Sequence, residues 1–124
     1  MCGHLSLYPE VILQQLGVDA DAVAAPEGFE AVFSKNASCV DDPSGTIYPS
    51  MDVIQETFFT GYRAVADALD QADDALFSKE NPNEAMRSKF PTKGAALGFY
   101  VGGHFMMHMG QVSAWRRAMG LGPA

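Results

Sequence analysis

Two of the three histidines, His104 and His108, are four residues apart near the end of the chain. Four residues make about one turn of an α-helix, so on a helix both imidazoles lie on the same face. This spacing allows two imidazoles to bind one cation, and it is typical of helical metal sites. For the pair to act together, the stretch around it must be helical.

The helical face that carries the pair decides how it is interpreted. At about 100° per residue, the two histidines share a stripe that we predict to be buried. Its other members are Tyr100, Val101, Met107, Gln111, Val112, Trp115 and Ala118. Each neutral imidazole needs one donor and one acceptor as partners, and this stripe offers mostly carbon. Two interpretations are open from spacing alone: core histidines held by hydrogen bonds, or a shared cation that satisfies both rings.

Three segments of the chain have apolar residues at helical spacing, and none alternates like a strand, so the predicted class is all-α. The three main helices are expected at about 1–17, 51–71 and 93–119, with a long irregular connection over 18–49. Gly17 is the expected C-cap of the first helix, and Ser50 and Thr92 are the expected N-caps of the others. Shorter helices are expected near 28–34 and 75–77.

Two of these helices have clear predicted faces. In the helix at 51–71 the apolar stripe consists of Ile54, Phe58, Tyr62, Val65 and Leu69. In the helix at 1–17 the stripe consists of His4, Tyr8, Val11 and Gln15, flanked by Leu5, Ile12 and Leu16. Pro9 lies inside this second pattern, and we expect it to kink the helix because its nitrogen cannot donate a hydrogen bond.

Length and charge exclude several classes of function. The 124 residues suit a single domain over 1–124 with a modest core. The net charge of −7 argues against nucleic acid and anionic membranes as partners, since both require basic patches. No apolar run approaches the roughly 20 residues of a membrane span, and no signal peptide is recognisable. We therefore expect a cytoplasmic protein.

The last predicted helix is unusually rich in glycine, with Gly94, Gly98, Gly102, Gly103 and Gly110. Each costs up to about 1 kcal/mol relative to alanine in a helix interior. Close helix packing is one explanation, and room for a ligand beside His104 is the other. Met106 and Met109 point away from the histidine stripe, which indicates a second contact surface such as a dimer face.

The third histidine of the chain, His4, also lies on a predicted core-facing stripe. In an antiparallel bundle, two inward stripes can meet at one level. Three histidines with one open position describe a zinc site of the catalytic type. The candidate metal ligands are therefore His4, His104 and His108, and zinc is the default metal, with nickel, iron and copper as alternatives.

Motifs at both ends of the chain resemble the DinB-like superfamily. The beginning is similar to that family's second helix, through Gly3-His4-Leu5, Tyr8-Pro9 and Leu16-Gly17. The end is similar to its fourth helix, through His104-x-x-x-His108-x-Gly110-Gln111, Trp115-Arg116-Arg117 and Gly120-Leu121-Gly122-Pro123. The resemblance implies an antiparallel up-down helix bundle with a metal-binding His triad formed by His4, His104 and His108. It also implies a further helix before His4, so we expect an N-terminally truncated bundle whose apolar groove is filled by a partner chain, giving a homodimer.

The resemblance implies a function as well. The superfamily includes metal-dependent transferases and isomerases that use low-molecular-weight thiols, with zinc or nickel as the usual metal. The expected function is a metal-dependent enzyme of the thiol-transferase or hydrolase type, acting on a small-molecule substrate. Gln111 and Tyr8 are the expected polar neighbours of the metal, and no general base can be named. The alternatives are a bundle whose metal is structural or sensory, and an interaction module without metal.

Overall fold

The computed structural model describes residues 1–123, and these residues form helices and connecting loops. The described residues contain no β-strand, only an isolated bridge between Glu80 and Thr92. The all-α prediction is therefore confirmed. The chain divides into two compact units, the first spanning Met1–Asp73 and the second beginning at Asp74. Within residues 1–123, no helix combines the length and the apolar character that crossing a membrane requires.

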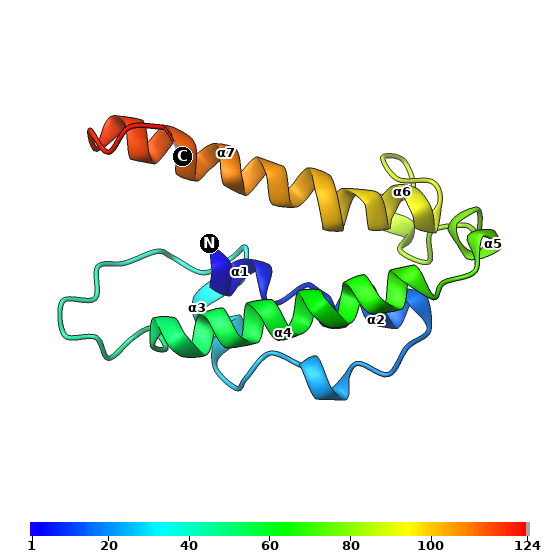
Figure 1. The fold of residues 1–124 in the computed structure, drawn as a ribbon, viewed down its shortest axis with the longest axis horizontal. Coiled ribbons are helices and arrows are strands. Elements are labelled where there is room, and N and C mark those ends of the chain that lie inside the picture. Colours follow the sequence, from blue (N-terminus) through cyan, green and yellow to red (C-terminus); the bar gives the residue numbers. More distant parts are fainter. Residues whose placement is uncertain (124) are drawn as a thin grey trace. The chain divides into compact units, whose positions relative to one another are not determined.

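The longest helix of the first unit is α4, Met51–Asp70, shown in green in Figure 1. It begins at Ser50, whose hydroxyl accepts a hydrogen bond from the backbone N–H of Val53, so the predicted N-cap is confirmed. Ile54 and Val65 are buried on one face, whereas the opposite face is exposed through Asp52, Glu56, Thr60, Arg63 and Asp67. This is the predicted division into an apolar and a solvated face.

The segment predicted as one kinked helix over 1–17 is two helices, α1 (Cys2–Leu5) and α2 (Pro9–Leu16). Pro9 occupies the first position of α2, where its missing N–H costs no hydrogen bond, so the chain restarts the helix there rather than bending it. The restart changes the helical phase. Leu13 is buried and Val11 is exposed, which corrects the predicted stripe. The C-cap prediction is confirmed, because Gly17 has a left-handed φ of 80°.

Both helices pack against α4, which Figure 1 shows beside them. Gly61 of α4 is buried and lies against the ring of Pro9. Leu5, Ile12 and Leu13 are almost completely buried and form the core of this unit.

The connection over 18–49 contains η1 (Asp21–Val23) and α3 (Phe29–Phe33). The short helix predicted near 28–34 is therefore confirmed. Phe29 is 1% exposed and contacts the ring of Phe33, which in turn stacks on Tyr48. Farther along, the carboxylate of Asp42 accepts three backbone N–H bonds, from Thr46, Ile47 and Tyr48, and these hold the pKa of that carboxyl below its usual value.

The second unit contains α5 (Asp74–Phe77), η2 (Glu84–Met86), α6 (Lys93–Gly98), η3 (Phe99–Gly103) and α7 (His104–Ala118). Thr92 caps α6 as predicted, with its hydroxyl accepting from the N–H of Ala95. The last three elements follow one another without a break and form a continuous rod in Figure 1. The predicted helix at 93–119 is thus present, but η3 is a π-helical turn that the apolar periodicity did not indicate.

The burial of the histidine stripe differs from the prediction beyond His108. Tyr100 and His104 are buried, as expected, but Gln111 and Ala118 are exposed. Met107 and Trp115 are 49% and 56% exposed. Val112 is half-buried. The predicted buried stripe is therefore wrong for Met107, Gln111, Trp115 and Ala118.

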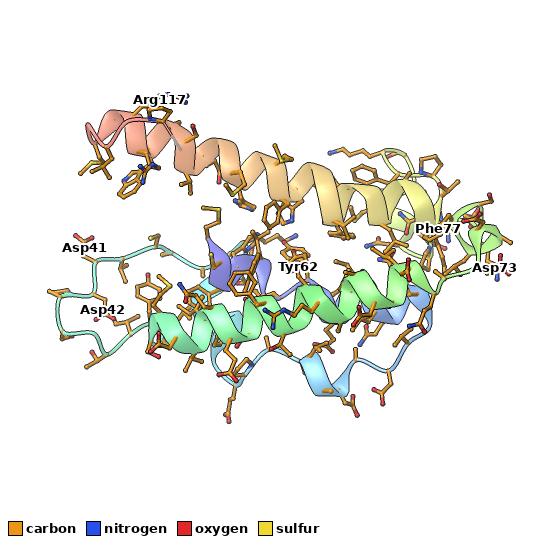
Figure 2. All side chains as sticks on the ribbon, viewed as in Figure 1. Asp41, Asp42, Tyr62, Asp73, Phe77 and Arg117 are labelled. Carbon is orange, nitrogen blue, oxygen red and sulfur yellow. The ribbon has the colours of Figure 1, made fainter. Side chains whose placement is uncertain are left out.

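Tyr62 projects from the middle of α4 (Figure 2) and gives the first unit a dependence on alkaline pH. Burial, with a smaller contribution from Tyr8, raises the pKa of Tyr62 from 10.0 to about 12. The folded state therefore keeps the phenol proton that the unfolded chain loses, and this contribution to stability declines as pH rises from 10 towards 12. In urea unfolding, Tyr62→Phe should lose less stability between pH 9 and pH 11 than the wild type. Equal losses would contradict the assignment.

Candidate metal centre

The two histidines of α7 face each other across one helical turn. Their Nε2 atoms lie 3.0 Å apart, and the ring centroids are separated by 4.7 Å. Nδ1 of His108 lies 2.8 Å from Oε1 of Gln111. Since an amide oxygen can only accept, Nδ1 carries the proton of the His108 ring, and Nε2 of His108 holds the lone pair. Nε2–H of His104 therefore donates to Nε2 of His108.

The separation of these two nitrogens fits a shared cation. With metal–nitrogen bonds of about 2.0–2.1 Å, two ligand nitrogens lie roughly 2.9 Å apart at a right angle and about 3.3 Å apart at the tetrahedral angle. The observed 3.0 Å lies inside this interval. A divalent ion would take the place of the proton between the rings, with no change in which nitrogens face each other. The donor set, two imidazoles, is one that zinc, nickel, iron and copper all accept.

The ring of His104 is held by an aromatic stack inside the second unit. The ring of Phe99 stacks on His104 at a centroid distance of 5.5 Å, and Phe90 stacks on Phe99 at 4.7 Å. His104 itself is only 6% exposed. The π-helical turn η3 runs from Phe99 to the residue before His104, so Phe99 belongs to both the turn and the stack. Such turns are frequent at functional sites.

The loop that carries Phe90 is held in place by Asn81, which is 1% exposed. The side-chain amide of Asn81 donates to the carbonyl of Phe90, its amide oxygen accepts from the N–H of Asn83, and its backbone carbonyl accepts from Arg87. A buried amide with these bonds fixes the loop, and through it the outer ring of the stack. This support could not be predicted from the sequence, because Asn81 lies in a segment with no periodic pattern.

His4 lies in the first unit, in α1, and both of its ring nitrogens have partners there. Nδ1 lies 2.7 Å from the backbone carbonyl of Phe33, and Nε2 lies 3.2 Å from the hydroxyl of Tyr8. A carbonyl can only accept, so Nδ1 carries the proton and Nε2 holds the lone pair, as in a histidine prepared to bind a metal. The role of the Phe33 carbonyl was missed, because a backbone acceptor has no signature in the sequence.

The three candidate ligands, His4, His104 and His108, could together hold a metal ion, with one ring nitrogen from each. Gln111 and Tyr8, predicted as polar neighbours of such a centre, are bonded to His108 and His4. The group includes no cysteine, aspartate or glutamate from the described residues. Whether the three bind a metal stays a prediction.

The glycines near His104 divide into two kinds. A Cβ on Gly94 would lie 3.0 Å from Phe77 of α5 (labelled in Figure 2), and one on Gly103 would lie 3.3 Å from the ring of Phe99. Gly94 supports the explanation of close helix packing, whereas Gly103 does not, because Phe99 belongs to the same helical turn. A Cβ on Gly98, Gly102 or Gly110 would meet no heavy atom of the described chain within 4 Å. For these three the packing explanation is not supported.

Comparison with known proteins adds no identification to this geometry. No protein-family model, no curated protein and no solved structure matches the chain.

Proposed function

We propose that this protein is a divalent-metal-binding protein of the DinB-like type, acting in the cytoplasm as a metal-dependent enzyme of the thiol-transferase or hydrolase type. The observation that carries the proposal is the pair of Nε2 atoms of His104 and His108, 3.0 Å apart. Their arrangement suits one cation in place of one proton. The resemblance of the motifs around all three histidines to the DinB-like superfamily supports the assignment of His4 as third ligand.

A three-histidine donor set leaves room for catalysis. Zinc sites with three protein ligands keep a further position open, whereas structural zinc sites are closed by four. A divalent metal in such a site supplies Lewis-acid chemistry, which lowers the pKa of a thiol or of water towards neutrality. We propose zinc as the metal and a low-molecular-weight thiol or another small molecule as the substrate.

The residues around the donor nitrogens have distinct roles in this proposal. The carbonyl of Phe33 and the side-chain amide oxygen of Gln111 accept hydrogen bonds from Nδ1–H of His4 and His108, which keeps the proton of each ring off Nε2. The ring of Phe99 fixes the plane of the buried His104 ring. Among residues 1–123, no aspartate or glutamate joins the three histidines, so no carboxylate general base is assigned.

Elemental analysis of the purified protein tests the proposal. We expect one equivalent of divalent metal per chain after dialysis against trace zinc, and a change in the absorption spectrum of the cobalt-substituted protein when a small thiol is added. Protein that binds no metal would contradict the metal centre. Metal that binds but never responds to thiols or other small ligands would contradict the catalytic part, because a closed site cannot accept a substrate.

Removing the acceptor of the His108 Nδ1 proton should weaken metal binding. Partners of this kind typically contribute 10- to 100-fold in affinity, and because Gln111 is exposed we expect about tenfold for Gln111→Leu. Isothermal titration with zinc measures the change. Ser113→Ala is the control, since Ser113 bonds to Arg117 and lies on the opposite side of α7. Equal affinities for Gln111→Leu and the wild type would contradict the role given to the amide.

A second copy of the chain is the partner that we propose for the exposed part of α7. Met106 and Met119 are 67% and 61% exposed there. All 15 acidic residues lie within 1–84, whereas 85–124 contain five of the eight basic residues and no acidic ones. The basic segment of one copy can therefore attract the acidic segment of another. Sedimentation velocity should show a dimer that weakens with added salt. A stable monomer at high protein concentration would contradict this pairing.

A further inference from the structure

The hydroxyl of Tyr8 contacts the nitrogen of His4 that the proposed function assigns to the metal. The distance from this hydroxyl to Nε2 is 3.2 Å. Because Nδ1 of His4 donates to the carbonyl of Phe33, Nε2 of the neutral ring has no proton, and the hydroxyl of Tyr8 is the donor in this contact. The protein thus supplies a hydrogen-bond donor of its own to the lone pair that a cation would need.

The two uses of this lone pair exclude each other. An imidazole nitrogen has a single lone pair, in the plane of the ring, and it either accepts a hydrogen bond or binds a metal. We propose that Tyr8 is a displaceable cap on His4, whose hydroxyl occupies Nε2 in the metal-free protein and leaves it when a divalent cation binds. This inference rests on the proposed function, and it makes Tyr8 a positioning residue that lowers metal affinity.

The geometry suits a bond that is easily released. A distance of 3.2 Å is long for a hydroxyl donor, whose hydrogen bonds are usually about 2.7–2.8 Å, so the contact is weak. The rings of Tyr8 and His4 also meet edge to face, with centroids 5.2 Å apart and an interplanar angle of 73°. This ring contact keeps Tyr8 beside His4 without the hydroxyl bond. Tyr8 stands at the start of α2, whereas His4 belongs to α1, so the two side chains are not fixed by one continuous helix.

The variant Tyr8→Phe lacks the hydroxyl and keeps the aromatic ring, so it distinguishes the effects of the two groups. The probe is zinc alone. The variant keeps the edge-to-face contact but has nothing to displace, so it should bind zinc with the same stoichiometry and more tightly. A hydrogen bond of ordinary net strength corresponds to about a 2- to 10-fold gain. Tyr48→Phe is the matched control, because the Tyr48 hydroxyl bonds to the backbone of Val40 instead. Its zinc affinity should be that of the wild type.

A second measurement uses the wild-type protein. Tyrosine absorbance depends on the hydrogen bond of the phenol, so adding zinc to the wild type should give a tyrosine difference spectrum, which Tyr8→Phe should lose and Tyr48→Phe should retain. Unchanged or weaker zinc binding by Tyr8→Phe, with normal binding by the wild type, would overturn the cap and leave the metal centre standing. Failure of the wild type to bind zinc would overturn the proposed function, and the cap with it.

Discussion

Replacing His108 with alanine is expected to lower the affinity for zinc by about a hundredfold or more. Zinc sites built from protein side chains bind with roughly 10–16 kcal/mol, so each ligand accounts for about 3–4 kcal/mol, and each 1.4 kcal/mol is a factor of ten. His108 is the better of the two α7 ligands to remove. His108 is only partly buried. His104 is buried against Phe99, so replacing His104 would disturb the aromatic stack as well.

Isothermal titration with zinc, together with elemental analysis, measures this effect. Met107→Ala is a suitable control, because Met107 is the preceding residue on α7, is 49% exposed and offers no imidazole. The control should bind one equivalent as tightly as the wild type, and circular dichroism should show both variants equally helical. Stoichiometric, tight zinc binding by His108→Ala would contradict the proposed donor set, since the remaining histidines cannot present the 3.0 Å pair of nitrogens.

The elements that could be predicted from the sequence are those that short-range physics determines. Ser50 and Thr92 cap their helices through side-chain bonds that reach only three residues. Gly17 ends α2 because glycine readily adopts a left-handed φ. The polar and apolar faces of α4 follow from its periodicity alone. The His104–His108 pair belongs to the same class, since a spacing of four residues brings two side chains together on any regular helix.

The features that were missed depend on contacts that a one-dimensional pattern does not encode. The π-helical turn before His104 keeps the apolar periodicity of an α-helix in the sequence, so nothing distinguishes it there. The carbonyl of Phe33, which accepts the His4 proton, belongs to the backbone and would be present with any residue type. The exposure of Trp115 could not be predicted either. An apolar stripe indicates which face of a helix favours burial, but not whether another part of the chain packs against that face.

Glycine is the residue type whose purpose the sequence left most open, and Gly61 shows why. It lies in the middle of α4, where alanine would ordinarily stabilise the helix by up to about 1 kcal/mol. A Cβ at this position would lie 2.6 Å from Cγ and 2.8 Å from Cβ of Pro9. The ring of Pro9 cannot rotate away, because it is closed onto the backbone at the first position of α2. One of the two helices must move instead.

Gly61→Ala should therefore destabilise the protein, against the trend of helix propensity. Overpacking of this kind costs about 1–3 kcal/mol, which exceeds the propensity gain, and Gly61→Val, with two further methyl groups, should cost about 3 kcal/mol or more. Gly110→Ala is the matched control. Gly110 also lies inside a helix, but a Cβ there meets no heavy atom of the described chain within 4 Å, so this variant should gain up to about 1 kcal/mol. Urea unfolding measures both variants. If both variants changed the free energy of unfolding in the same direction, helix propensity and not the Pro9 contact would explain the glycine at position 61. The two positions differ in this contact, which only Gly61 makes.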